Sequence, residues 1–462
     1  MSDENKDPAP VVPTPEGIQE ILHKVIFAHQ QALTLLQQTE TAYGRLVPHQ
    51  LLNLLEVKSI VDVKLGDQVE RKMTIMFSDI RDFTPLSESM TPTENFEFIN
   101  SYLSQMEPVI SKHGGIIDKY MGDSIMALFP HDADDALSGA IAMLEKLVHY
   151  NAGRERAGYR PIEIGIGLNT GLVIIGTVGG TNRMDSTVIG DPVNLTSRIE
   201  EATKIYHSPL LISQNTLYDL GDPTKYDIRF LDRLRVKGKT QPLSVYEVFN
   251  NDPADLRDGK RASKLHFEEA IACYHMKEIP RSIALLARCI EIAPKDVPAH
   301  IYMERCQDYL ATGQHINTGE IGIGLEWRKV FQTGIHELDL THKKLFDQIN
   351  AFATAQKEHN TFCDMFAYLA DHAQHAFKTE EDLMHRHSYP FLESHLQEHK
   401  RFIENFTALK NEFETGDCDP LYLSFRTQIL LFDWFTGHIA KADRHVGRHL
   451  STSAPPPAPH PA

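Results

Sequence analysis

Two aspartates stand next to apolar runs that are typical of β-strands. Asp79 ends the run TIMFSD, and Asp123 occupies a Gly-Asp turn between IIDKYM and SIMALF. Either aspartate alone is more often a turn or cap residue. On neighbouring strands, however, the pair would present its carboxylate oxygens together, and such oxygens are the ligands that Mg²⁺ and Mn²⁺ prefer. Two ions held there would activate an attacking oxygen and clamp a leaving phosphate.

A second polar pair lies in the segment TVIGDPVNLTSRIE. Asn194 and Arg198 are four residues apart, so on a helix they project from one face. An amide beside a guanidinium suits the negative charge that develops in phosphoryl transfer. Taken alone, the pair also fits a capped helix with a surface arginine.

Histidines gather in the C-terminal part of the chain. Half of the 24 histidines fall within residues 327–450, where long helix-like stretches with short connections predict a four-helix bundle. His395 and His399 are four apart on one helix, a spacing that lets two imidazoles share a metal. His438 and Asp443, five apart, are near a helical repeat. A bundle core can bring such residues to one centre.

Composition and pattern divide the 462 residues into several predicted segments. Alternating strand-like and helix-like stretches after Thr74 predict an α+β domain. The helices after the linker at 251–261 are punctuated by prolines, and their small and aromatic residues resemble one tetratricopeptide unit. The predicted order is 1–15 disordered, 16–46 a dimerisation helix, 47–250 the α+β domain, 262–313 a helical connector, 326–450 the bundle, and 451–462 a disordered Pro-rich tail.

The dimerisation helix is predicted from a heptad seam. Apolar or tolerated residues alternate at spacings of four and three: Ile18, Leu22, Val25, His29, Ala32, Leu36, Thr39, Tyr43 and Leu46. We interpret the seam as a parallel two-stranded coiled coil. The alternative is a single amphipathic helix that lies on its own domain.

Charge and cysteine usage exclude several classes of protein. The formal net charge of −17 argues against nucleic acid or an anionic membrane as the main partner. No apolar run approaches the roughly 18 residues that a spanning helix needs, and the acidic, Pro-rich N-terminus is unlike a signal peptide. Five scattered cysteines without C-x-x-C spacing indicate reduced thiols and a cytoplasmic location.

Four segments, FSDIRDFT, DKYMGD, GDPVNLTSRIE and VKGKTQPLSVYEVF, resemble the signature stretches of class III nucleotidyl cyclases, in the order of that family. The resemblance covers residues 46–249 and implies a ferredoxin-like βαββαβ-type domain that forms a head-to-tail homodimer. It also implies two metal ligands for Mg²⁺ or Mn²⁺, a transition-state pair and a phosphate-binding lysine, which are Asp79 and Asp123, Asn194 and Arg198, and either Lys237 or Lys239.

Base choice in such cyclases depends on two further positions, here Lys119 and Thr187. Lysine only donates hydrogen bonds, which suits the unprotonated ring nitrogen of adenine, and Thr187 can accept from the exocyclic amine. Guanylate cyclases resemble one another in an acidic residue and a cysteine there, so ATP is the expected substrate. Threonine occurs at this position in a subgroup that includes bicarbonate-responsive members, which makes bicarbonate an additional hypothetical effector.

The C-terminal segments WRKVFQTGIHELDLTHKKLFDQIN, HAFKTEEDLMHRHSYPFLESHLQEHKRF and WFTGHIAKADRH resemble bacterial hemerythrin-like domains. Such domains hold two non-haem irons with five histidines and two carboxylates. The resemblance implies as ligands His342, Glu380, His395, His399, His438 and Asp443. Ala376 stands where a further histidine is expected. The neighbouring His375 points about 100° away on a regular helix and would need a π-bulge to turn inward; otherwise one iron lacks a ligand.

These features together favour a regulated adenylate cyclase, whose C-terminal bundle senses oxygen, redox state or iron. A rival hypothesis is a metal-binding or oxygen-binding protein with an inactive cyclase module. Guanylate cyclase activity is a third hypothesis, which Lys119 and Thr187 disfavour.

Overall fold

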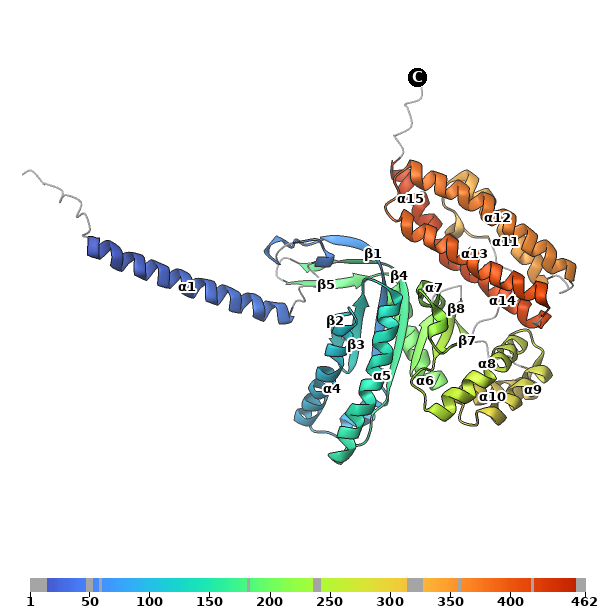
Figure 1. Cartoon of the computed structure of the whole chain (residues 1–462), viewed down its shortest axis with the longest axis horizontal. Helices are drawn as coiled ribbons and strands as arrows, with labels where there is room; N and C mark the ends of the chain where they lie inside the picture. The colour runs from blue at the N-terminus through green and yellow to red at the C-terminus, as the bar shows by residue number, and fades with distance from the viewer. Residues whose placement is uncertain are drawn as a thin grey trace, which may run out of the picture. The chain divides into compact units, whose positions relative to one another are not determined.

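The computed structural model contains two compact units, formed by residues 1–69 with 175–186 and by residues 70–174 with 187–462 (Figure 1). None of the helices it describes combines the length and the apolar character that crossing a bilayer requires. Both predicted disordered termini, except a few residues at their inner edges, lie outside the described part, as do Lys237 and Lys239. The described residues are 15–46, 53–57, 60–180, 183–235, 242–313, 327–354, 359–416 and 419–453.

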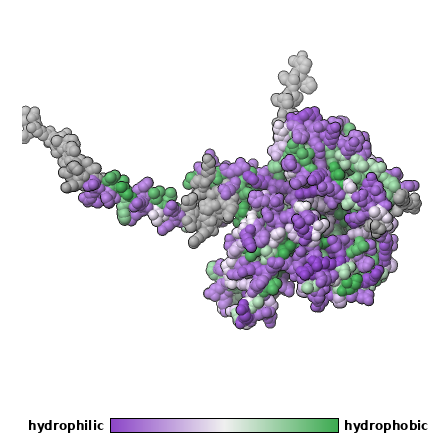
Figure 2. Space-filling view, in the orientation of Figure 1, coloured by the Kyte–Doolittle hydropathy of each residue, from purple (hydrophilic) through white to green (hydrophobic). Residues whose placement is uncertain are grey.

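The first unit is dominated by helix α1, which runs from Pro15 to Leu46. Three apolar residues of the predicted seam are more than half exposed: Leu22, Val25 and Leu36. Figure 2 shows hydrophobic side chains along this helix among hydrophilic ones. The unit also contains backbone hydrogen bonds that tie Gly66 and Asp67 to Thr177. The pairing of two such helices stays a prediction.

A mixed sheet forms the centre of the α+β domain, and the predicted fold class is confirmed. Its strand order is β2-β3-β1-β4-β6-β8-β7, and β5 pairs with β4. The pair β4–β6 is parallel, whereas β1–β3, β2–β3, β6–β8 and β7–β8 are antiparallel. The strands are β1 (Gln68–Ile80), β2 (Ile116–Met121), β3 (Ser124–Phe129), β4 (Ile164–Gly180), β5 (Arg183–Ile189), β6 (Leu210–Ser213), β7 (Ile228–Arg235) and β8 (Pro242–Val248).

Amphipathic helices cover this sheet. On α4, Phe98, Tyr102, Met106 and Ile110 recur every four residues and are all buried, so one face of the helix joins the core. The Thr91 side chain and Glu94 form a capping box that fixes where α4 begins. The helices of the domain are η1 (Ile60–Asp62), α3 (Phe83–Glu88), α4 (Pro92–Lys112), α5 (Ala133–Arg156), α6 (Asp191–Tyr206), α7 (Gln214–Asp219) and η2 (Pro223–Lys225).

Three helices follow the sheet domain, α8 (Ala254–His275), α9 (Ile279–Ile292) and α10 (Val297–Thr312). They are fixed to strand β7 by buried polar contacts. Arg229 pairs with Glu247 at 2.6 Å and with Asp296 at 2.7 Å, and Tyr302 donates to the Leu231 carbonyl at 3.0 Å. These helices occupy the predicted connector, and its likeness to a tetratricopeptide unit stays a prediction.

The C-terminal part is a helical bundle whose core is rich in phenylalanine. Its fourth long helix changes character part-way, because α14 passes directly into a π-helical segment, η4, before α15. The elements are η3 (Lys329–Phe331), α11 (His336–Thr354), α12 (His359–Arg386), α13 (Leu392–Thr415), α14 (Pro420–Trp434), η4 (Phe435–Asp443) and α15 (Arg444–Ser453).

Gly167 on β4 permits the close packing of α6 against the sheet. A Cβ atom at this position would collide with the Glu200 amide nitrogen and would lie 2.9 Å from the Thr196 carbonyl oxygen, both backbone atoms of α6. Because backbone cannot move aside as a side chain can, only glycine fits there.

We therefore expect Gly167→Ala to lower the free energy of unfolding by about 1–3 kcal/mol and to displace α6. The measurement is the denaturant midpoint, read by circular dichroism. Gly153→Ala is the matched control, since Gly153 lies inside α5 with no neighbour near its missing Cβ. The control should hold or raise stability, because alanine favours a helix by about 1 kcal/mol over glycine. Equal midpoints for Gly167→Ala and wild type would contradict this packing argument.

Candidate active site and metal centre

Strand β1 ends beside the β2–β3 hairpin, and this places two carboxylates together. Ser78 of β1 is paired with Ile125 of β3, so Asp79 lies next to the hairpin turn that holds Asp123. The turn is tight because Gly122 adopts a φ of 68°, in the left-handed region that glycine enters without strain. The sequence prediction that both aspartates stand at neighbouring strand ends therefore matches the geometry.

Hydrogen bonds hold the two carboxylates in place. Asp79 accepts from Ser124 Oγ at 2.5 Å and from Lys204 Nζ at 2.7 Å, and Asp123 accepts from the Ile80 amide at 3.2 Å. Burial raises the pKa of Asp123 to about 6, and the neighbouring Asp79 adds to the rise. Burial alone would raise the pKa of Asp79 too, but the bonds from Lys204 and Ser124 hold it below its usual value.

A third carboxylate, Glu200, lies close to this pair. Its Oε1 is 3.7 Å from Lys204 Nζ, and the residue is 8% exposed. Burial raises the pKa of Glu200 to about 7, and the charge of Asp79 contributes to the rise. One lysine is thus shared between two acidic side chains. Such a surplus of negative charge around oxygen ligands is what a divalent cation neutralises.

The predicted transition-state pair lies on α6, the helix that also carries Glu200 and Lys204. Asn194 is exposed and Arg198 is half-buried, and within the described residues neither side chain has a hydrogen bond or an ion pair. The predicted base-recognition pair, in contrast, is brought together, because Lys119 Nζ donates to Thr187 Oγ1 at 3.4 Å. Lys119 also lies 3.2 Å from the Asp118 carboxylate.

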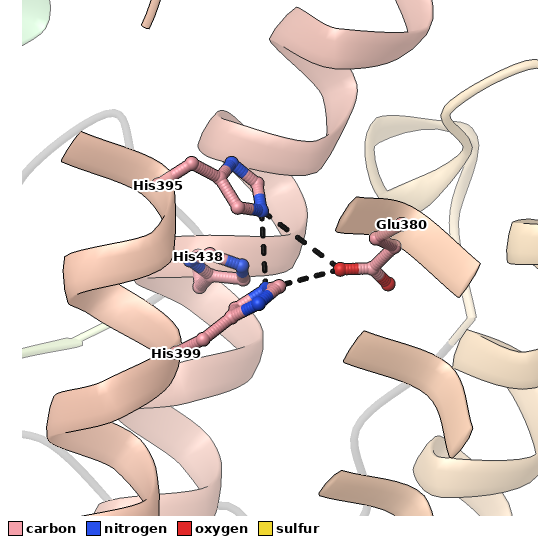
Figure 3. Close-up of side chains that lie close together, drawn as sticks. All are labelled: Glu380, His395, His399 and His438. Carbon is pink, nitrogen blue, oxygen red and sulfur yellow. Dashed lines mark hydrogen bonds and ion pairs between the residues drawn. The ribbon is translucent and has the colours of Figure 1, made fainter. Parts of the chain in front are cut away.

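The bundle gathers the predicted iron ligands into two adjoining clusters that share Glu380. Figure 3 shows the cluster that contains the three histidines His395, His399 and His438. His395 Nε2 and His399 Nε2 are 3.1 Å apart, and His399 Nε2 is 3.2 Å from Glu380 Oε2. Every member is at most 3% exposed. Within each cluster the ligand atoms lie within 4.8 Å of one another, and the members are Glu380, His395, His399 and His438 in one and His342, Glu380 and Asp443 in the other.

The π-helical segment explains the five-residue spacing of His438 and Asp443. In a π-helix the backbone bonds run from i to i+5, so residues five apart lie on one face. His438 Nε2 and Asp443 Oδ1 are 3.0 Å apart, and Asp443 Oδ2 is 3.2 Å from His342 Nε2. In a regular α-helix the same spacing would turn the two side chains about 140° apart. The widened turn therefore brings both groups to one centre.

The donor set fits a metal centre. Buried Glu380 Oε2, His438 Nε2 and both carboxylate oxygens of Asp443 lack a well-aligned hydrogen bond, although nitrogen and oxygen atoms approach closely. Buried polar atoms normally have such a partner, and a metal ion would supply it. The outer nitrogens of two histidines are already oriented, since Nδ1 of His438 lies 2.7 Å from Glu398 and Nδ1 of His399 lies 3.0 Å from Glu381.

No neighbouring histidine in α12 takes the place of the histidine that Ala376 replaces. Ala376 is buried among apolar side chains in α12, and this helix is α-helical throughout its length. The alternative in which a π-bulge turns His375 inward does not occur. Its side chain is 69% exposed, and its Nδ1 lies 3.0 Å from the Asp371 carbonyl oxygen. The buried His372, one turn earlier, belongs to neither ligand cluster; burial lowers its pKa to about 4.

Sequence reasoning missed four residues of these sites, namely Lys204, Glu200, Glu381 and Glu398. Lys204 reaches a carboxylate 125 residues earlier in the chain, and no local spacing predicts such a contact. Glu200 and Lys204 are four apart on α6, which indicates only an ordinary helix pair. For Glu398 a signal existed, because it immediately precedes the predicted ligand His399.

Two histidines of the predicted ligand set should make the metal-free protein less stable as the pH rises into the alkaline range. Burial alone would lower their pKa values, but nearby carboxylates raise the pKa of His342 to about 9 and that of His438 to about 10. In the unfolded chain the value is about 6.5. The stabilisation is therefore complete below about pH 6.5 and is lost as the pH rises through 9 to 10.

The expected result is a melting temperature of chelator-treated protein that falls between pH 7 and pH 10, measured by circular dichroism. A protein with both His342→Gln and His438→Gln should show a shallower fall, whereas the exposed His375→Gln should follow the wild type. A wild-type profile no steeper than that of the double variant would refute the assignment of this slope to the cluster.

Comparison with known proteins supports the division of the chain into these two sites. Residues 66–249 match the family model described as the adenylate and guanylate cyclase catalytic domain, and residues 333–450 match the hemerythrin HHE cation binding domain. The solved structure of the guanylyl cyclase Cya2 is similar at 36% identity with a TM-score of 0.35, over 39% of this chain and 92% of that one.

Two relatives carry names of enzymes. The terminal-differentiation-specific adenylate cyclase of Dictyostelium discoideum is 36% identical over 289 residues, which are 61% of this chain and 14% of the relative. An adenylate cyclase of Anabaena cylindrica is 42% identical over 227 residues, which are 48% of this chain and 45% of the relative. The chain thus spans less than half the length of either relative. It is a chain with a class III cyclase catalytic domain followed by a C-terminal hemerythrin HHE domain.

Proposed function

We propose that this protein is an adenylate cyclase that converts ATP to 3′,5′-cyclic AMP and pyrophosphate at the interface of a homodimer. The observation that carries the proposal is the adjacency of Asp79 and Asp123, which the β1 end and the β2–β3 turn hold together with Lys204 and Glu200 nearby. The names of the two relatives agree with ATP as substrate.

The chemistry would be in-line attack of the ribose 3′ oxygen on the α-phosphorus, with pyrophosphate as the leaving group. Asp79 and Asp123 would hold two Mg²⁺ or Mn²⁺ ions, which supply activation of the attacking oxygen and charge neutralisation on the departing group. Arg198 would stabilise the charge on the transferring phosphoryl group, and Asn194 would orient the nucleotide. Either Lys237 or Lys239 would contact the triphosphate.

Adenine would be recognised by the adjacent Lys119 and Thr187. The ammonium group donates to the unprotonated ring nitrogen. Thr187 Oγ1 has two lone pairs, and the 3.4 Å contact with Lys119 occupies one of them. The other would accept a hydrogen bond from the exocyclic amine. Guanine has a protonated ring nitrogen at the same edge, which an ammonium group cannot satisfy.

A homodimer would complete the site. Asn194 and Arg198 have no side-chain partner within the described residues, although they are polar groups on a helix next to the carboxylate cluster. If each served the carboxylates of the other subunit, a head-to-tail pair would contain two equivalent sites. The exposed apolar residues of α1 would support the same pairing.

The bundle would act as the regulator. Its buried carboxylates and imidazoles suit non-haem iron, and we propose that oxygen, redox state or iron loading biases the cyclase reaction. Such regulation requires that the metal centre interact differently with active and less active arrangements of the catalytic part.

The test is to incubate purified full-length protein with Mn²⁺ and either ATP or GTP, in air and under anaerobic reduction, and to quantify products chromatographically. We expect cyclic AMP, a lower yield of cyclic GMP, and different rates in the two atmospheres. No cyclic nucleotide in any arm would refute the enzyme assignment. Equal rates in both atmospheres would refute redox regulation but would not affect the enzyme assignment.

Complementation tests the shared site. Asp123→Ala and Arg198→Ala should each reduce activity by about a hundredfold or more. A one-to-one mixture should recover up to about a quarter of the wild-type rate, because half of the dimers are mixed and each contains one intact site. Lys400→Ala, an exposed residue on α13, is the matched control and should retain the full rate. A mixture no more active than its components would exclude the shared interface.

Ala376→His tests the incomplete iron site. A histidine one helical turn before Glu380 would supply the imidazole that the sequence lacks, so iron content should rise from about one towards two per chain. The measurement is elemental analysis after anaerobic Fe²⁺ loading and desalting. His375→Ala should not alter the content of the wild type. Two irons per chain already in the wild type would show that Ala376 removes no essential ligand.

A further inference from the structure

Strand β1 connects the two sites through its side chains. Glu70 and Lys72 are two residues apart on the strand, so they share one face, and both contact the bundle. Lys72 Nζ lies 3.5 Å from Glu398 Oε1 on α13, and Glu70 Oε2 lies 3.0 Å from His445 Nε2 on α15. The same strand carries the proposed metal ligand Asp79 one residue before its end at Ile80.

The two carboxylate oxygens of Glu398 contact different parts of the molecule, one in the bundle and one on strand β1. Oε2 accepts from Nδ1 of His438 at 2.7 Å, whereas Oε1 faces Lys72. The other ring nitrogen of His438, Nε2, lies in the ligand cluster with Glu380, His395 and His399. One carboxylate therefore separates an imidazole of the metal centre from an ammonium group on the catalytic strand.

Lys72 contacts two carboxylates, those of Glu398 and Asp219. Asp219, at the end of α7, accepts from Lys72 Nζ at 2.9 Å and from Arg401 Nη1 at 2.5 Å. Burial alone would lower the pKa of Lys72, but Glu398 and Asp219 raise it, so the ammonium form persists. Glu70 is connected to the ligand cluster less directly. Its partner His445 lies 2.8 Å from the Tyr389 hydroxyl, and the Tyr389 ring packs edge-on against the ring of His395.

The contact also borders a cavity. A space of about 400 Å³ lies between α13, η4 and the sheet domain, and its wall includes Lys72, Glu398, His395 and His438. The ion pair and two predicted iron ligands thus share one environment. Water in this space screens the charges only partly, because Glu398 is about 29% exposed and His438 about 2%.

We infer that Glu398 is a positioning residue that orients His438 and, through its ion pair with Lys72, couples the metal centre to the strand that carries Asp79. The inference rests on the proposed function, because it names the physical link by which the bundle would regulate the cyclase. In carboxylate–histidine–metal arrangements the outer carboxylate fixes the ring and tunes its basicity. Binding free energies are reciprocal between coupled sites. If the two sites are coupled in this way, a substitution of Lys72 changes the affinity of the cluster for iron.

The experiment measures iron affinity, since a contact that only holds two domains together would not change it. Fe²⁺ is titrated anaerobically into metal-free full-length protein, and binding is followed by competition with a chromophoric chelator. Glu398→Gln should weaken iron binding by about 10- to 100-fold. Lys72→Gln, which touches no ligand, should shift the affinity by about fivefold or more. Lys72→Arg keeps the charge and should restore most of the wild-type value.

Matched controls separate this link from general effects of charge and folding. Glu404→Gln removes an exposed carboxylate from the same helix, whose ion pair among the described residues is with Lys400 at 3.9 Å, and should leave iron affinity unchanged. Circular dichroism checks that each variant is folded. If Lys72→Gln binds iron within twofold of the wild type, the link is overturned, whatever the cyclase rates are.

The rate measurement completes the test. In the wild type, iron loading should change the rate of cyclic AMP formation, and in Lys72→Gln the ratio of iron-loaded to iron-free rates should move towards one. A wild type that makes no cyclic nucleotide would refute the proposed function, but the iron titration would still decide the link. A Lys72→Gln protein with the full wild-type ratio would overturn the inference.

Discussion

Both sites in this protein depend on holding carboxylates close together, half-buried at the strand ends and fully buried in the bundle. Asp79 faces Asp123 at the strand ends, and Glu380 shares a buried cluster with Asp443. Repulsion between like charges grows as the surroundings become less polar. The chain offsets part of this cost with its own cations, Lys204 at one site and protonated histidines at the other. A divalent metal concentrates more positive charge at the same place, so both clusters have the charge balance that a bound cation would complete.

Directional polar contacts join the bundle to the sheet domain and to the helices that follow it. Ser244 on β8 donates to Asp433 at 3.1 Å, and Tyr422 on α14 donates to Glu268 on α8 at 2.7 Å. Hydrogen bonds of this kind require particular orientations of both partners, unlike apolar contacts, which tolerate sliding. These bonds thus constrain the orientation of the bundle relative to strand β8 and helix α8, and the proposed coupling requires such a constraint.

Much of this arrangement could be predicted from the sequence, and the failures have physical causes. The α+β class and the helical bundle followed from the strand-like and helical patterns. The aspartates, Lys119 with Thr187, and the six buried residues predicted as iron ligands lie together as the motifs indicated. Contacts between distant segments were not predictable, because Lys204 and Glu398 meet their partners only after folding. Of the two alternatives for the position of Ala376, the π-bulge in α12 does not occur, and the π-helical segment η4 was not predicted, because the five-residue spacing of His438 and Asp443 is also near an ordinary helical repeat.

The widened turn η4 also lets the chain hold one more residue than an α-helix holds over the same rotation. Removing one residue between His438 and Asp443 would leave the pair four apart, which an ordinary α-helix also places on one face. Because five residues of a π-turn cover about the same rotation as four of an α-turn, the side chains of α15 would keep their directions. Gly447 would still face the Thr333 carbonyl oxygen, with which a Cβ would collide, and His445 would still face Glu70. Natural variants of this segment should therefore tolerate the loss of a residue inside η4 better than a loss inside α15.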